Sequence, residues 1–258
     1  MLILLPPSET KEFGTNRAKL NLAKLCFPEL TASRQKVLFA LLALSKSPNK
    51  AIKVLGISQK QVAEVVHNSE LETAKTSAAI SIYNGVLFDA FDYQTLKKSA
   101  QKKADESVLI TSALFGLLKL QDSIPHYRLS GDTTLPKIGG VSNVWKQPTD
   151  LTMKRLSPDL IIDMRPSVYA KFWQPTGDLI SKTVVIKIMT EVGSGKSAKK
   201  IAISHSNKLT KGLLAREIVG LSKTPKTSRE LFVHLTKQNW ECVLQEVSGK
   251  PDLLEIFI

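Results

Sequence analysis

Short apolar runs recur along this chain of 258 residues and are separated by longer segments with helical periodicity. The runs that predict strands are LILLP (2–6), SVLITSALFGLL (107–118), DLIIDM (159–164), KTVVIKIMTE (182–191), KKIAISHS (199–206), ECVLQEV (241–247) and LLEIFI (253–258). Helices do not separate these strands in strict alternation, so the order favours an α+β fold over a doubly wound parallel sheet. Because no repeat or linker composition interrupts the chain, we predict a single compact domain over residues 1–258, with a mixed central sheet and surrounding helices.

The N-terminal run MLILLPP has no basic segment before it, and we expect a first strand rather than a signal peptide. No apolar run approaches the roughly 20 residues that cross a membrane. The two cysteines, Cys26 and Cys242, lie far apart in apolar contexts, which suits thiols in a reducing compartment. These features predict a cytoplasmic protein, and we expect it to be a monomer.

The charge of the chain is strongly unbalanced. It has 36 Lys and Arg residues against 23 Asp and Glu residues, which gives a formal net charge of +13. Such an excess favours polyanionic partners such as DNA, although solubility alone is an alternative explanation. The excess is concentrated in residues 196–226, which hold eight basic residues and a single acid, Glu217.

A helix is predicted over residues 207–219, within this basic segment. At about 100° per residue, one arc of this helix holds Lys208, Lys211, Gly212 and Arg216. The opposite, apolar arc holds Leu209, Leu213, Leu214 and Ile218. The pattern predicts a basic face with a bare centre, to which a phosphate backbone can come close. The alternative is a solvated face on which the glycine serves helix packing.

The segment IKVLGISQKQVAEVV predicts two helices joined by a turn at Gly56. A helix-turn-helix requires a small residue at the position of Ile52 and a second helix rich in cations. This segment has neither. A helix-hairpin-helix over about residues 49–68 places Ser58 and Lys60 where a phosphate binds at a helix N-terminus. A plain helical hairpin with a serine cap is the third interpretation.

Motifs for metals, nucleotides and covalent catalysis are absent from the sequence. The stretch EVGSGKS resembles a P-loop, but that motif requires glycine at position 190, where Thr190 stands, so a hairpin tip is the better interpretation. No pair of His or Cys residues has metal-ligand spacing, and no nucleophile elbow is present. The sequence therefore predicts no metal site and no cofactor, and it favours a protein that is not an enzyme.

Polar residues that gather in loops near the predicted strands form a possible pocket: Ser8, Glu9, Lys11, Asp122, Tyr127, Arg128 and Asp163. Within it, Arg128 either grips a phosphate or an oxyanion, or ties its Gly- and Pro-rich loop to a neighbouring carboxylate. Two carboxylates near a tyrosine and an arginine suit general acid–base work or Mg²⁺ binding. The alternative function is thus an enzyme acting on nucleic acid or on a small phosphorylated metabolite.

Several segments in order along nearly the whole chain resemble the YaaA family of bacterial peroxide stress proteins, and in particular its actinobacterial branch. The segments are MLILLPPSET, GISQKQVAEVVHN, YNGVLFDAF, SALFGLLKLQDSIPHYRLSG, IIDMRPSVY and ISHSNKLTKGLLAR. The resemblance implies a single α+β domain of the YaaA type and a cytosolic role in limiting iron-linked peroxide damage. It also implies DNA binding through a helix-hairpin-helix and a positive cleft.

The resemblance carries over residue by residue only in part. The DNA contacts it implies, together with those from the charge pattern, are Gly56, Ser58, Lys60, Arg128, Lys208, Lys211, Gly212 and Arg216. Two positions depart from the family pattern, because Glu9 stands where many members have lysine and Asp163 where they have asparagine. The combined prediction is a DNA-binding protein with little base specificity.

Overall fold

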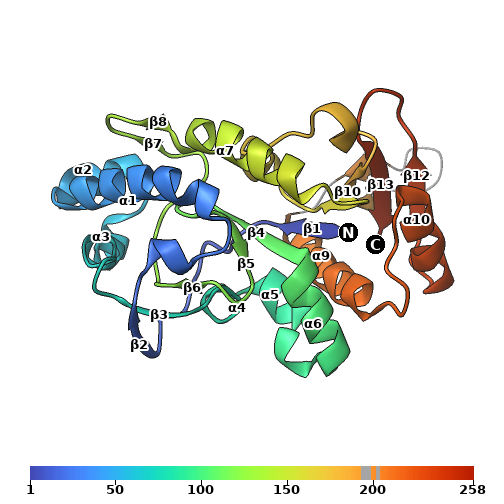
Figure 1. Cartoon of the computed structure of the whole chain (residues 1–258), viewed down its shortest axis with the longest axis horizontal. Coiled ribbons are helices and arrows are strands. Elements are labelled where there is room, and N and C mark those ends of the chain that lie inside the picture. Colours follow the sequence, from blue (N-terminus) through green and yellow to red (C-terminus); the bar gives the residue numbers. More distant parts are fainter. Residues whose placement is uncertain (193–198, 202–203) are drawn as a thin grey trace.

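The computed structural model describes residues 1–192, 199–201 and 204–258. Its largest sheet contains β1 (Leu2–Leu5), β4 (Val108–Ser112), β5 (Gly116–Lys119), β9 (Ile161–Asp163), β10 (Thr183–Val192), β11 (Lys199–Ile201), β12 (Cys242–Gln245) and β13 (Asp252–Phe257). The strand order is β12-β13-β10-β9-β1-β4-β5, with β11 paired to β10 (Figure 1). Strands β13, β10, β9, β1 and β4 are parallel, whereas β12, β5 and β11 pair antiparallel. The predicted mixed sheet of an α+β fold is confirmed.

Strand β1 lies at the centre of the sheet. Its residue Ile3 pairs with Val108 of β4 on one side and with Ile162 of β9 on the other. All four residues of β1 are buried, which is expected of a parallel strand covered on both faces. The continuous apolar run at the N-terminus is therefore the sequence signal of this position.

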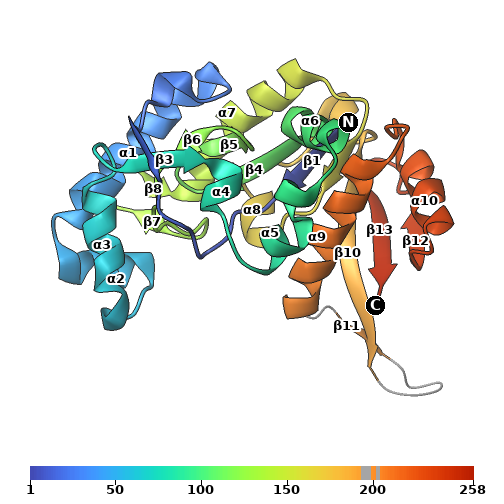
Figure 2. The same ribbon diagram turned by 90° about the horizontal axis from the view of Figure 1, so that it is seen from below.

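Helices cover both faces of the sheet. They are α1 (Thr31–Ser45), α2 (Pro48–Leu55), α3 (Val62–Ser69), α4 (Ala79–Ile82), α5 (Val86–Phe91), α6 (Lys98–Ser107), α7 (Val141–Leu156), α8 (Ser167–Ala170), α9 (Ser204–Gly220) and α10 (Ser228–Lys237). Helix α7 lies on one face, and α5, α6 and α9 lie on the other (Figures 1 and 2). The buried apolar side chains form one continuous core, as the single-domain prediction requires.

Helices α1, α2 and α3 lie at the end of the molecule opposite α10 (Figure 1). Near them are the short strands β2 (Asn16–Lys19), β3 (Lys75–Ala78), β6 (Ser123–Ile124), β7 (Thr134–Leu135) and β8 (Gly139–Gly140). Helix α2 ends at Gly56, which has φ of 62°, and a 3₁₀ turn, Gln59–Gln61, leads into α3. The predicted pair of helices with a turn at Gly56 is confirmed, while its role as a DNA-binding helix-hairpin-helix stays a prediction.

The predicted hairpin in the C-terminal half is formed by β10 and β11, in which Thr190 pairs with Ile201. Of its predicted tip, residues 192–198, only the first belongs to the described part of the chain. Helix α9 begins at Ser204, three residues before the predicted start. Among the described residues, no helix combines the length and the hydropathy needed to cross a membrane.

Candidate functional site

The loops that follow β1, β4 and β9 all leave the same edge of the sheet, because these strands are parallel and adjacent. The chain passes from β1 to β4 on one side and later returns to β9 on the other side. In α/β sheets, ligands bind at the carboxyl ends of the strands where the strand order reverses in this way. The loop after β1 carries Ser8, Glu9 and Lys11 of the predicted polar pocket.

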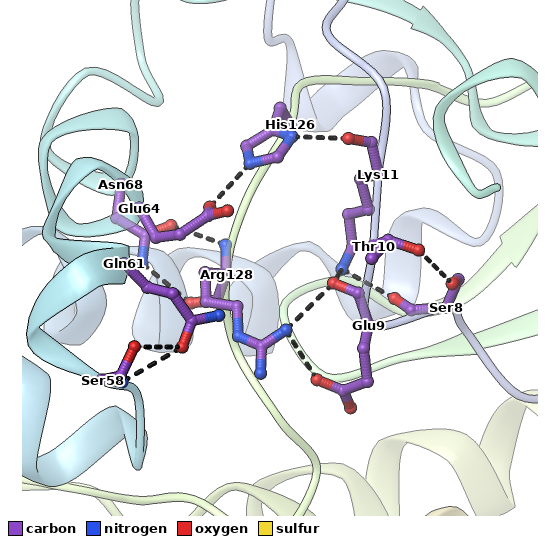
Figure 3. Close-up of polar contacts among 10 residues, drawn as sticks. All are labelled: Ser8, Glu9, Thr10, Lys11, Ser58, Gln61, Glu64, Asn68, His126 and Arg128. Carbon is purple, nitrogen blue, oxygen red and sulfur yellow. Dashed lines mark hydrogen bonds and ion pairs between the residues drawn. The ribbon is translucent and has the colours of Figure 1, made fainter. Parts of the chain in front are cut away.

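Lys11 is the most unusual residue of this loop. Its Nζ lies 4.4 Å from the ring centre of Tyr127 and 5.5 Å from that of Tyr83. It donates to the carbonyl oxygens of Ser8, at 2.8 Å, and Glu9, at 3.4 Å (Figure 3). Burial lowers the pKa of Lys11 to about 8, although the nearby Glu9 carboxylate opposes this effect. A buried amine with a lowered pKa can bind an anion or accept a proton near neutral pH.

Arg128 reaches the same loop from the opposite side (Figure 3). Its Nη1 lies 2.9 Å from Oε2 of Glu9 and donates to the Glu9 carbonyl oxygen at 3.1 Å. The backbone of Arg128 is fixed by two hydrogen bonds to the Asn68 side chain of α3, at 2.8 and 2.9 Å. These contacts match the second interpretation of this arginine, in which it ties its loop to a carboxylate.

Tyr127 forms the wall behind Lys11. Its hydroxyl lies 2.8 Å from the hydroxyls of both Tyr83 and Ser112, and Ser112 is the last residue of β4. Burial raises the pKa of Tyr127 well above its usual value and raises that of Tyr83 to about 12. Both phenols are therefore neutral at physiological pH, and their contacts make them a fixed support for the amine of Lys11.

The two aspartates of the predicted pocket have other partners. Asp122 accepts hydrogen bonds from the amides of Cys26 and Lys119, both at 2.8 Å. Asp163 forms a bidentate pair with Arg165, at 2.8 Å to Nε and 2.7 Å to Nη2. Both aspartates therefore have partners of their own, and the contacts join Ser8, Glu9, Lys11, Tyr127 and Arg128 of the predicted pocket. Acid–base work or Mg²⁺ binding by a pair of its carboxylates stays a prediction.

Helix α9 does not present the predicted basic face. Lys211 is only 7% exposed, and burial lowers its pKa to about 8, opposed by Asp163. A Cβ on Gly212 would lie 2.2 Å from the carbonyl oxygen of Leu87 in α5, so the helix-packing alternative for this glycine is confirmed. Arg216 donates to the carbonyl oxygens of Phe91 and Asp92 and to the hydroxyl of Thr95.

The predicted apolar arc of α9 is also wrong in part. Leu214 and Ile218 are buried as expected, but Leu209 and Leu213 are 45% and 44% exposed. The helix packs against α5, α6 and β10, and it therefore buries more than one face. Of the four basic-arc residues, Lys208 is the exposed one.

Exposed cations lie instead on the first two helices and on the turn that follows them. Residues 31–63 contain no Asp or Glu, and their exposed cations are Lys36, Lys46, Lys50, Lys53 and Lys60. In the described part of the chain, none of these five makes an ion pair. The sixth cation, Arg34, is buried and donates to four carbonyl oxygens. The absence of acids from residues 31–63 is the sequence signal of this exposed basic segment. We call these five residues the lysine surface.

The amides at the hairpin turn are already used. Gly56 and Ile57 donate to the carbonyl oxygens of Lys53 and Ile52, at 3.4 and 3.2 Å. The Ser58 amide donates to Oε1 of Gln61 at 3.1 Å (Figure 3). These three amides are therefore engaged, and the exposed side chain of Lys60 remains as a phosphate ligand of the helix-hairpin-helix interpretation.

Comparisons with known proteins place the chain among bacterial relatives. It matches the family described as "Peroxide stress protein YaaA" over residues 1–232. It is 34% identical over 262 residues to a UPF0246 protein of Streptomyces coelicolor, covering 100% of this chain and 98% of that protein. It is 41% identical over 234 residues to a UPF0246 protein of Corynebacterium efficiens, covering 90% of each. The chain therefore belongs to the YaaA family of peroxide stress proteins.

Proposed function

We propose that this protein binds the phosphate backbone of DNA in the cytoplasm, with little base specificity, and thereby limits iron-dependent oxidative damage. In this proposal a monomer holds DNA on the lysine surface, with Lys60 at the hairpin turn. Membership of the peroxide stress family supports the physiological setting. The observation that supports DNA as the partner is the lysine surface, since five exposed lysines in a segment that contains no acid, residues 31–63, suit phosphate neutralisation.

The proposal differs from the sequence prediction in where DNA lies. Lys211 and Gly212 are buried, and Arg216 is bound to the α5–α6 connection, so these three residues serve the fold before any ligand. Lys208 remains an exposed cation of α9, and Arg128 is paired with Glu9. We therefore expect the main contribution from α1, α2 and the hairpin, and a smaller one from α9.

Binding of a labelled 20-base-pair duplex, measured by fluorescence anisotropy over a series of salt concentrations, tests this proposal. If all five lysines neutralise phosphates, the plot of log K against log salt has a slope of about −4.5. The triple variant Lys50→Ala, Lys53→Ala, Lys60→Ala reduces that slope to about −1.8. The matched control is Lys97→Ala, Lys98→Ala, Lys102→Ala, which removes three exposed lysines around α6 and the same charge.

The outcomes distinguish DNA binding at the lysine surface from attraction of DNA by the net charge of the protein. A control variant that keeps the wild-type slope, next to a lysine-surface variant that loses it, supports the proposal. An equal loss of slope in both variants means that net charge alone attracts DNA. An affinity of the wild-type protein that does not depend on salt contradicts binding to the DNA backbone. Bubble and junction DNA in the same series reveal any preference for distorted duplex.

A second candidate function rests on Lys11. Its amine is buried beside two neutral phenols, has a pKa lowered to about 8, and lies in the same loop cluster as Arg128. These features suit an enzyme that acts on a small phosphorylated metabolite. Thermal shift measurements with a panel of phosphorylated metabolites, on the wild type and on Lys11→Met, test it. A shift seen with the wild type and lost in the variant favours this function, and the absence of any shift with the wild type removes it.

A further inference from the structure

Three potential metal ligands meet between α3 and the loop that follows β6. Glu64 and His67 are three positions apart on α3, so their side chains lie on one face of that helix. His126 comes from the loop. One ring nitrogen of each histidine and a carboxylate oxygen of Glu64 all lie within 4.8 Å of one another. Metal-ligand spacing along the sequence does not reveal this group, because His126 is remote from α3 along the chain.

The orientation of His126 is fixed by a neighbouring backbone oxygen. Its Nδ1 lies 3.1 Å from the carbonyl oxygen of Lys11 (Figure 3). A carbonyl oxygen can only accept a hydrogen bond, so Nδ1 carries the proton and Nε2 is turned toward Glu64, 2.7 Å from its Oε2. Metal-binding histidines have this arrangement, in which one ring nitrogen donates to a backbone carbonyl and the other faces the ion.

His67 supplies the second observation. Its Nδ1 is buried and has no hydrogen-bond partner, which is the case for only four side-chain nitrogen or oxygen atoms in the described residues. A buried polar atom without a partner is unfavourable, and an ion bound at the site is one explanation for it. By contrast, Nε2 of His126 has a neighbour, since it lies 2.7 Å from Oε2 of Glu64.

The surroundings of the two histidines also resemble those of a ligand site. The ring of Phe13 stacks on His126 at 4.4 Å and meets the edge of His67 at 4.8 Å, although Phe13 is 56% exposed. Both histidines line a cavity of about 340 Å³, which Glu70 also borders. An apolar cover beside a cavity leaves room for further ligands on a bound ion and shields its protein ligands from water.

We propose that Glu64, His67 and His126 bind a divalent first-row transition-metal ion. Two imidazole nitrogens and one carboxylate suit Zn²⁺, Fe²⁺ or Co²⁺, whereas Mg²⁺ and Ca²⁺ prefer ligand sets made of oxygen. With metal–ligand bonds of about 2.0–2.1 Å, neighbouring ligand atoms lie about 3 Å apart. The pair formed by Glu64 and His126 is already near that separation, and the His67 nitrogen lies within 4.8 Å of both. This proposal does not depend on DNA binding.

Untagged protein, stripped with a chelator, is titrated with Zn²⁺ by calorimetry and with Co²⁺ by visible absorption. We expect one ion per chain and a Co²⁺ spectrum with the d–d bands of a site with nitrogen ligands. An anaerobic competition with Fe²⁺ then ranks the ions. His67→Ala is the decisive variant, because the Nδ1 atom of His67 has no hydrogen-bond partner to lose. It should weaken Zn²⁺ binding by a factor of at least about 100.

The control is His234→Ala, which removes a histidine of α10, at the other end of the molecule. Glu64→Gln and His126→Ala should also abolish the Co²⁺ spectrum, and unfolding curves check that these variants are folded. The increase in melting temperature that Zn²⁺ gives the wild type should persist in the control and vanish in His67→Ala. Stoichiometric binding that survives His67→Ala, or a wild type that binds neither Zn²⁺ nor Co²⁺, overturns the proposal.

Discussion

The lysine surface and helix α9 are both rich in cations, but the cations of the first are exposed, whereas those of the second are partly buried or bound to backbone oxygens. In α9, Lys211 is buried and Arg216 donates to backbone carbonyl oxygens of a neighbouring segment. On α1 and α2 the lysines are exposed and make no ion pairs with described residues. The difference shows that a count of cations does not locate a polyanion site until the packing of each helix is known.

The physical reason is the number of faces that each helix buries. Helix α9 packs against α5, α6 and β10, so even its polar positions must be accommodated in the interior. Helices α1 and α2 lie at one end of the molecule and keep a free side (Figure 1). Long lysine side chains on such a side extend into water, where they are available to a ligand.

The largest loss of stability should come from replacing Gly212, the glycine at the centre of α9. Gly212→Ala places a Cβ 2.2 Å from the Leu87 carbonyl oxygen, which is backbone and cannot rotate away. Helices α5 and α9 must separate, and we expect a loss of about 3 kcal/mol in the free energy of unfolding, measured in urea. Gly220→Ala, where no atom lies within 4 Å of the new Cβ, is the control. Equal stability of the two variants would show that Gly212 is not a packing residue.

The next effect concerns the buried amine of α9. The folded-state pKa of Lys211 is about 8, below the usual 10.5, so between these pH values the unfolded chain holds a proton that the folded chain has lost. Stability therefore rises with pH across this window. We expect Lys211→Met to be more stable than the wild type by about 3 kcal/mol at pH 7, and this advantage to vanish near pH 10.5. Denaturant curves at several pH values measure it, and a difference that does not depend on pH contradicts the burial of a charged amine.

Sequence alone predicted the main sheet well, because its strands are local signals. The apolar run before Pro6 marks the central strand, and the apolar runs of β4, β9, β10 and β13 mark its parallel partners. Strands β2, β3 and β6 were missed, since they are short and partly polar. The helices predicted on either side of Gly56 and over residues 207–219 were also found. The direction in which α9 faces depends on α5, which no local pattern reveals.

The candidate site was less predictable than the fold. The loop after β1 and the segment around Arg128 were selected correctly as neighbours, since polar loops at the ends of parallel strands converge. Asp122 and Asp163 were grouped with them by residue type, whereas each is satisfied by partners close by in the fold, the Lys119 amide and Arg165. The meeting of His67 with His126 is a tertiary contact without a sequence pattern.

A smaller loss of stability is expected from a substitution at the hairpin turn. Gln61→Ala removes the acceptor of both the amide and the hydroxyl of Ser58, and we expect a loss of about 1 kcal/mol in the free energy of unfolding. DNA affinity should stay within about twofold of the wild type, because the proposed contact at the turn is the Lys60 side chain. If the turn instead grips phosphate through its amides, freeing the Ser58 N–H should strengthen binding. Anisotropy and urea unfolding on the same protein preparation separate the two results.

The smallest expected change is in DNA affinity, when one exposed lysine is removed from each region. Lys60→Ala removes a cation of the lysine surface, and Lys208→Ala removes the exposed cation of the predicted α9 arc, so both lower the net charge equally. If Lys60 neutralises one phosphate, its loss should reduce the salt slope by about 0.9, which between 50 and 200 mM salt amounts to about a threefold change in affinity. Lys208→Ala should change the slope by less, since Lys60 belongs to the five exposed lysines on which the proposal places DNA. A larger change for Lys208→Ala would mean that DNA follows α9 despite its buried centre, and the comparison between the two regions would then be reversed.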